Sequence, residues 1–407
     1  MLKSPAFATD SGMPTAIHRN VVLLGLAQLL AWGSTYYLPA MLALPMAHDL
    51  GLSNGTVFAA FSWALVVSAL LGPVAGWASD QLGGRTVLMA SSLVLAAALA
   101  LLAQAQDALQ LFITWSLIGA GMAAGLYEGA FAAAVQFYGR GARGPITGIT
   151  LLGGLASTLA WPLSASLEVS LGWRQTCLVW AALHLLINLP LYALLRQPSK
   201  RPLAGASEPD AEPPMDGSTE LSAAQQRRGA LLLALIFALT WFISTAMAAH
   251  LPRLLQLQGI DLAAALLLAG LIGPAQVAGR LLEYTVLRHR HPLLSARLAC
   301  AMHPLGAALF MLIGAPAGVL FALLHGLGNG VLTIAKGVLP LMLFGTQGYA
   351  LRQGLLMVPA RFAQALAPLV FAMVLDHWGA RALWLSAALG LVCLGALLAL
   401  PQAKPQP

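Results

Sequence analysis

Four ionisable side chains lie inside long apolar stretches of this 407-residue sequence: Glu128, Arg280, Lys336 and Arg361. If those stretches cross a lipid bilayer, each such group costs roughly 2.5–3.5 kcal/mol on insertion scales, which indicates a functional role. Arginine offers a planar, two-pronged set of donors to an anion, and lysine offers a compact charge. A buried glutamate can take up and release a proton, with a pKa set by its neighbours. These residue types predict anion binding together with proton movement.

The elements that position these residues are hydrophobic helices. Only 9% of the residues are charged, where roughly 25% is usual for a soluble protein. The chain is 59% apolar with a mean hydropathy of +0.80, and apolar runs of about 20 residues recur along it. The formal charge of +7 is spread over short clusters between these runs, which predicts membrane topology and no nucleic-acid partner. The fold class predicted is an all-α integral membrane protein.

Twelve membrane spans are predicted, in two sets of six. A polar interval at 196–228, with prolines and charges of both signs, predicts a flexible linker between the two sets. The chain is then a tail at 1–19, a six-helix bundle at 20–195, the linker, a second bundle at 229–400 and a tail at 401–407. The spans are expected near 20–46, 55–79, 86–105, 108–138, 146–169, 174–195, 229–251, 262–287, 292–314, 316–344, 350–375 and 380–400.

The basic residues predict the orientation. Fifteen of the 21 lysines and arginines fall on the linker side of these spans, three on the other side and three at membrane depth. Such a bias places the linker and both termini in the cytoplasm, as in a multi-pass protein of the cell (inner) membrane. Three distant cysteines in apolar runs predict neither a disulfide framework nor a metal site, and no cofactor is expected.

The two halves repeat each other at an offset of 206 residues. Tyr138-Gly139, Gly148 and Pro162 correspond to Phe344-Gly345, Gly354 and Pro368, and Gly72-Pro73 corresponds more loosely to Gly273-Pro274. Each of the last two pairs is followed by a glycine and then an acid, Asp80 or Glu283. Duplicated six-span halves predict two facing bundles with a shared path near the middle of the bilayer.

The stretch from Gly76 to Arg85, Gly-Trp-Ala-Ser-Asp-Gln-Leu-Gly-Gly-Arg, resembles the signature loop of the major facilitator superfamily. The resemblance extends over the twelve spans and implies the fold of that family, in which the loop is a conformational latch. Asp80 and Arg85 inherit that gating role, and Asp80 is expected to pair with a neighbouring arginine or a helix N-terminus of its own bundle.

Within the family, the chain looks most like the bacterial branch related to monocarboxylate porters and the oxalate:formate antiporter. Isolated bases lie in its eighth and eleventh spans, and Gly172-Trp173-Arg174 follows the fifth. Trp161-Pro162 stands where drug:proton antiporters would have Gly-Pro, which disfavours drug efflux.

A central site is predicted between the halves. Glu128 lies about ten residues, or roughly 15 Å, from the end of its span, and Lys336 lies at nearly the same depth in the other half. Arg361 and Lys336 are expected to bind an anionic group while Glu128 carries the proton. A structural or gating salt bridge between Glu128 and one base is the alternative. Arg280 and Glu283, one helical turn apart, predict a gating pair that echoes Asp80.

Further residues are candidates for the wall of this site. Tyr36, Tyr127 and Asn329 could line it with hydroxyl and amide donors, and His325, one turn from Asn329, could relay protons. Helix packing is the alternative for each of them.

The function predicted is secondary active transport of a small anionic solute by alternating access, coupled to a proton or a counter-solute. The expected partners are the solute, the coupling species and the bilayer, with the monomer as the functional unit. A proton-driven exporter of an amphipathic or toxic compound is the alternative. The sequence has no His-Glu-x-x-His and no acid pair that could serve as a hydrolytic dyad, so no enzyme is predicted. A sensory receptor would need an output module, which the linker sequence does not provide.

Overall fold

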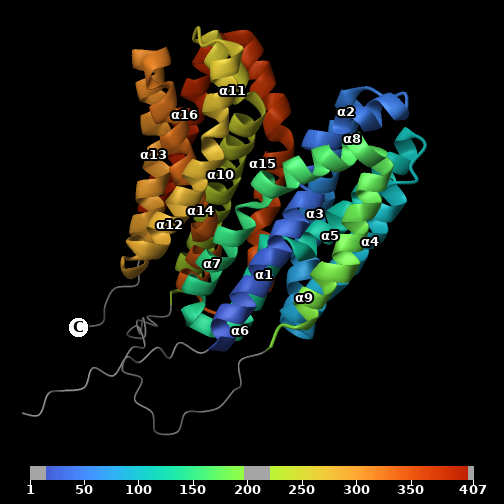
Figure 1. The fold of residues 1–407 in the computed structure, drawn as a ribbon. Coiled ribbons are helices and arrows are strands. Elements are labelled where there is room, and N and C mark those ends of the chain that lie inside the picture. Colours follow the sequence, from blue (N-terminus) through green and yellow to red (C-terminus); the bar gives the residue numbers. More distant parts are fainter. Residues whose placement is uncertain (1–14, 197–220, 402–407) are drawn as a thin grey trace, which may run out of the picture.

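The computed structural model describes residues 15–196 and 221–401, and these residues are almost entirely helical. They form two bundles that stand side by side (Figure 1). The first bundle contains α1 (Thr15–Ser34), α2 (Leu38–Asp49), α3 (Asn54–Leu82), α4 (Gly84–Leu102), α5 (Ala108–Gly125), α6 (Tyr127–Tyr138), α7 (Arg143–Gly153), α8 (Ala156–Leu183) and α9 (Leu189–Ala193). The second contains α10 (Ala223–Leu257), α11 (Leu262–Gly270), α12 (Ile272–Thr285), α13 (Pro292–Ile313), α14 (Gly318–Phe344), α15 (Tyr349–Trp378) and α16 (Ala382–Leu398).

Nine described stretches are long and apolar enough to cross a membrane, and two of them turn back on themselves. The stretch Ala108–Ala193 would be about 130 Å long as one helix, against a hydrocarbon core of about 30 Å. It reverses at Gly139 and Gly172, whose φ angles are 57° and 80°. Tyr349–Leu398 reverses in the same way at Gly379, with φ 57°. Only glycine adopts such angles without strain, and these turns raise the number of crossings to twelve, as predicted.

The second bundle begins earlier than predicted. Helix α10 starts at Ala223, so the last residues of the expected 196–228 linker are helical. The Ser222 side chain accepts from the Gln225 N–H, and the Gln225 side chain accepts from the Ser222 N–H, which is a capping box. The polar residues after it extend the helix beyond the apolar run. The expected 1–19 tail is also shorter, since α1 begins at Thr15. Residues 1–14, 197–220 and 402–407 lie outside the described residues.

A break within the fourth span places one of the ionisable groups. Leu126 leaves the helical conformation between α5 and α6, with φ −84° and ψ −164°. Glu128 is therefore in the first turn of α6, where the helix dipole favours a negative charge. A Cβ on Gly129 would overlap the carbonyl oxygen of Ala124, so the break also requires a residue without a side chain.

The two bundles pack against each other through α3 and α15, and through α6 and α7 against α12, α14 and α15. In Figure 1 the bundles converge toward the end of the molecule where α6 and α7 lie; α9 also ends there, and we call this end the linker side. Glycines permit the close approach. A Cβ on Gly76 would lie 2.7 Å from the carbonyl carbon of Ala350, and one on Gly354 would lie 2.7 Å from that of Gly72.

Candidate functional site

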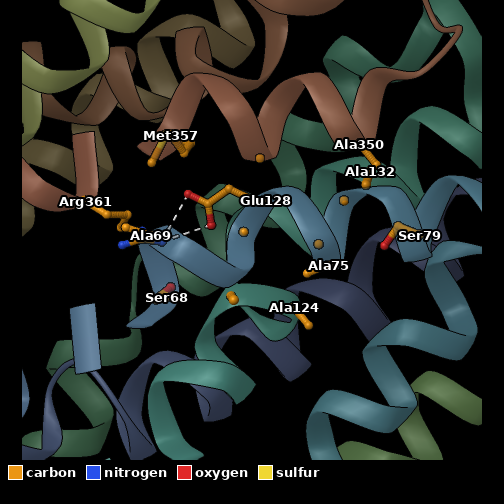
Figure 2. Close-up of a pocket in the computed structure, with 15 residues that line it drawn as sticks. Ser68, Ala69, Ala75, Ser79, Ala124, Glu128, Ala132, Ala350, Met357 and Arg361 are labelled. Atoms are coloured by element: carbon orange, nitrogen blue, oxygen red, sulfur yellow. Dashed lines mark hydrogen bonds and ion pairs between the residues drawn. The ribbon is translucent and has the colours of Figure 1, made fainter. Parts of the chain in front are cut away.

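Glu128 and Arg361 form an ion pair between the two bundles. The Arg361 Nη2 atom donates to both carboxylate oxygens of Glu128, at 3.1 and 3.0 Å, and Nη1 donates to Gln364 Oε1 at 2.9 Å. The Arg361 side chain is 3% exposed and that of Glu128 is 15% exposed. Figure 2 shows Glu128 on α6 pointing toward Arg361 on α15. The predicted meeting of an acid and a base from opposite halves is therefore present.

A small cavity lies beside this pair. Its walls come from α3, α5, α6 and α15, and Ser68, Ala69, Ala124 and Met357 lie among its lining residues (Figure 2). Its volume of about 20 Å³ exceeds the 10–15 Å³ that one water molecule needs. Small side chains thus leave room for water next to the Glu128 carboxylate.

Lys336 and Arg361 share one aromatic ring. The Lys336 Nζ atom lies 4.1 Å from the centre of the Trp241 indole, and Arg361 Cζ lies 5.4 Å from it. Lys336 is 6% exposed and forms no ion pair among the described residues. The negative face of an indole stabilises a nearby cation but does not neutralise it. Both bases predicted for the centre thus lie around one side chain of α10.

Aromatic side chains continue from Trp241 into the first bundle. Trp32 of α1 is stacked with Trp241, with ring centroids 6.2 Å apart and planes 11° apart. Tyr36 lies 5.3 Å and Tyr127 lies 5.0 Å from Trp32, between ring centroids. The two tyrosines predicted for the wall therefore join this aromatic cluster. Asn329 does not, since its Nδ2 donates to Ser244 Oγ at 2.9 Å within the second bundle.

His325 contacts a partner that the sequence analysis did not pair with it. Its Nδ1 lies 2.9 Å from Nδ1 of His303, and Nε2 of His303 lies 3.1 Å from Ser386 Oγ. Among the described residues, no hydrogen bond joins His325 to Asn329, one turn away on α14, although both line a second pocket in this bundle. The His303–His325 pair lies within the second bundle, and no hydrogen bond or ion pair among the described residues joins it to Glu128.

Asp80 binds a helix N-terminus of the opposite bundle. The expectation that its partner belongs to its own bundle is therefore wrong. Its Oδ1 and Oδ2 atoms accept from the backbone N–H groups of Ala350 and Leu351, at 3.3 and 2.9 Å. These are in the first turn of α15, where free N–H groups and the helix dipole favour a carboxylate. Sequence proximity suggested the same bundle, but α3 and α15 are neighbours in space. Arg85 is exposed, with no hydrogen bond or ion pair among the described residues.

The predicted Arg280–Glu283 pair is not formed. Glu283 Oε1 instead accepts from Arg143 Nη2 of the opposite bundle, at 2.7 Å. Arg143 also donates to the carbonyl oxygens of Leu287 and Arg290, at 3.0 and 2.7 Å. The spacing along α12 allowed the first pairing, but the approach of α7 provides a closer base. Arg143 had been counted only among the linker-side bases, and no local pattern marks it as a partner of Glu283.

Arg280 is left as a buried base without a carboxylate. It is 4% exposed, and its Nε and Nη1 atoms have no hydrogen-bond partner among the described residues. The guanidinium lies against the backbone of Gly154, where a Cβ would overlap Nη1. Gly154 belongs to the break between α7 and α8. Arg280 thus reaches across to the first bundle but forms no ion pair with any residue that the structure describes.

His291 adjoins the Arg143 contacts and caps α13. Its Nδ1 accepts from the Leu293 N–H at 3.3 Å. Partial burial and the nearby charges of Arg143 and Arg297 lower the pKa of His291 below its ordinary value. A neutral imidazole is the form that can accept at this position.

A profile of the Major Facilitator Superfamily matches residues 24–335, which is more than half of the chain. The chain belongs to the major facilitator superfamily. A superfamily member is a multi-pass membrane protein and a secondary transporter, not an enzyme.

Solved superfamily structures share this fold. The human organic anion transporter MFSD10 (TETRAN) has a TM-score of 0.65 at 20% identity, covering 95% of this chain and 100% of its own. FucP in the outward conformation has a TM-score of 0.71 at 14% identity, with the same coverage. The proton:xylose symporter XylE, bound to 6-bromo-6-deoxy-D-glucose, has a TM-score of 0.68 at 14% identity, covering 96% and 97%. No curated protein sequence matches the chain significantly.

Proposed function

We propose that this facilitator is a proton-coupled carrier of a small organic anion. The observation that carries the proposal is an excess of buried positive charge. Arg280, Lys336 and Arg361 are each at most 6% exposed, and of the three only Arg361 has a carboxylate partner among the described residues. Uncompensated buried charge is costly, and a bound anion relieves that cost.

The Glu128–Arg361 pair supports the coupling role. A proton on Glu128 removes the negative charge that holds Arg361, and the carboxylate or phosphate of a solute can then take its place. The solute carboxylate replaces the Glu128 carboxylate at Arg361. When a monoanion is bound and Glu128 carries a proton, the net charge of the site equals that of the empty site with ionised Glu128. The exchange therefore avoids the large cost of changing the charge of a buried site. The cavity beside Glu128 has room for a water molecule that could exchange a proton with the carboxylate.

We propose that the contacts on the linker side close that end of the path. The Asp80 carboxylate binds the first turn of α15, and Arg143 forms an ion pair with Glu283. These two contacts join the bundles on the linker side. Both must break for the solute to pass. Arg85, exposed beside Asp80, belongs to the same loop and remains a candidate for a pairing formed when the bundles rearrange.

We further propose that the linker side faces the cytoplasm of the cell (inner) membrane, with both termini there. Fifteen of 21 basic residues support this orientation. Arg280 and Arg361, the bases of the eighth and eleventh spans, support a place in the branch related to monocarboxylate porters and the oxalate:formate antiporter. A proton-driven exporter of an amphipathic compound would use Glu128 equally well. Such a pump has no need of two unpaired bases, so the charge excess favours an anion.

Transport by purified protein in proteoliposomes tests the proposal. Counterflow with a panel of organic anions identifies the solute, and a pH gradient then drives its accumulation. Glu128→Gln is expected to keep counterflow, which needs no net proton movement, and to lose accumulation against a gradient. Glu168→Gln is the matched control, because Glu168 lies on α8 without an ion pair among the described residues.

Two results would contradict the proposal. The coupling role of Glu128 is wrong if Glu128→Gln concentrates the solute as the wild type does. The anion assignment is wrong if counterflow finds only neutral or cationic solutes.

A further inference from the structure

The stacked indoles of Trp32 and Trp241 come from opposite bundles. Trp32 belongs to α1 and Trp241 to α10, and their planes differ by only 11°. Alternating access moves one bundle against the other, so this stack must open during the cycle. Opening exposes two large aromatic faces, each of which favours another ring in stacked contact.

Both indole N–H groups are buried without an acceptor. Trp32 Nε1 and Trp241 Nε1 have no hydrogen-bond partner among the described residues. A buried donor left without a partner costs about 1–3 kcal/mol, and a ligand with acceptor oxygens removes that cost. Trp115 Nε1 shares this property but belongs to α5, which packs against α1, α3, α4 and α6 of the first bundle, so movement between the bundles does not uncover it.

Cations lie around the same ring. Lys336 Nζ and Arg361 Cζ are 4.1 and 5.4 Å from the Trp241 centroid. Both bases lie over this ring, and their flexible side chains can turn from the indole face toward a carboxylate on the edge of a ring stacked there. Tyr36, 6.5 Å from Trp241 and 5.3 Å from Trp32, closes the edge of the stack.

We propose that the transported anion is a planar aromatic carboxylate, whose ring inserts between Trp32 and Trp241 while its carboxylate binds Lys336 and Arg361. This deepens the proposed function and rests on its anionic solute. Ring insertion needs the indole planes about 7–8 Å apart, because each stacked face requires carbon contacts of about 3.5–4.0 Å. The centroids now lie 6.2 Å apart, so the ring enters as the bundles part.

Two probe anions isolate the contribution of the ring. Benzoate and cyclohexanecarboxylate have the same charge and the same number of carbons, but only benzoate is planar. Their affinities for the purified wild-type protein are measured by quenching of tryptophan fluorescence and by competition in counterflow. Two stacked faces are expected to favour benzoate by on the order of 5- to 150-fold. Benzamide, planar and neutral, is expected to bind much more weakly than benzoate.

Variants assign that preference to the indole pair. Trp241→Leu removes one of the two stacked faces and is expected to reduce the preference for benzoate by roughly 2- to 13-fold, while Trp241→Phe keeps most of it because an aromatic face remains. Trp115→Phe is the control and is expected to leave the preference unchanged. Equal affinities in the wild type, failure of both anions to bind, or a Trp241→Leu variant with the full preference would each overturn the inference.

The outcomes also separate this inference from the proposed function. Coupled transport of non-aromatic anions alone, abolished by Glu128→Gln, would remove the aromatic class and leave the carrier mechanism intact. Selective benzoate binding with proton coupling unaffected by Glu128→Gln would instead remove the coupling role of Glu128 and leave the aromatic class intact.

Discussion

Replacing Gly76 by alanine is expected to open the linker side of the protein. The added Cβ would lie 2.7 Å from the carbonyl carbon of Ala350 and 2.8 Å from Leu351 Cα. These are backbone atoms of α15, so no side chain can rotate away and the two helices must separate. Overpacking of this kind costs roughly 1–3 kcal/mol. That cost falls only on the conformation in which α3 and α15 touch, and it shifts the conformational equilibrium by on the order of 5- to 150-fold.

Distances between spin labels measure this shift. Thr86 and Thr285 are exposed, one in each bundle at the linker side, and can carry the labels as cysteines. The native Cys177, Cys300 and Cys393 are buried, which restricts labelling to the introduced sites. Double electron–electron resonance on the labelled Gly76→Ala variant should show a larger population at long distances between positions 86 and 285 than the labelled wild type shows.

Gly72→Ala provides the matched control. Gly72 lies one turn from Gly76 on the same helix, but its Cβ would meet Gly354 only at an ordinary contact distance of 3.6 Å. Its distance distribution is expected to match that of the wild type. Equal shifts in both variants, or no shift in Gly76→Ala, would refute the argument that close glycine contacts hold this side together.

Three further predictions concern individual contacts. Asp80→Ala removes the carboxylate that caps α15, a loss of about 1 kcal/mol, and should increase the open population of the same label pair several-fold. The pKa of His291 is lowered in the folded protein, so the unfolded state binds more protons; its contribution to stability is complete above the unfolded pKa and is lost as pH falls toward the folded pKa. The melting temperature should therefore fall less between pH 7 and pH 5 in His291→Asn than in the wild type, and an identical fall would contradict this. Ser386→Ala leaves His303 Nε2 without its partner and should lower the melting temperature without changing proton coupling, whereas lost coupling would place the histidine pair in the transport mechanism.

Much of the fold followed from the sequence because membrane spans are marked by composition. Hydrocarbon-length apolar runs and the glycine turns between them define the crossings, and all twelve are present. The predicted linker extended to residue 228 because the prediction followed the apolar runs, and the first turns of α10 are polar. The Ser222–Gln225 capping box is a local signal that identifies the true start.

The centre of the site was predictable because buried charges are rare and costly. Glu128 and Arg361 had few partners available at membrane depth, so their meeting followed from the duplicated halves. Contacts at the linker side were not predictable in this way. Asp80 and Glu283 each bind a group of the opposite bundle, and spacing along one helix contains no information about which helix approaches it.

Histidine pairing shows the same limit. His325 was assigned to a proton relay from its neighbour one turn away, but its partner, His303, lies on another helix. Tyr36 and Tyr127, predicted as candidates for the wall of the site, lie in the aromatic cluster, while Asn329 hydrogen bonds within its own bundle. Polar residues in the second bundle could face either the central path or its interior, and periodicity does not distinguish these.

Proton uptake on solute binding tests the central claim most directly. Purified protein in weakly buffered detergent solution, with a pH indicator, should take up about one proton per chain when the transported anion is added, because the anion displaces Glu128 from Arg361 and Glu128 becomes protonated. Glu128→Gln should bind the anion without this uptake. Binding without proton uptake in the wild type, or unchanged uptake in Glu128→Gln, would contradict the exchange of carboxylates on Arg361.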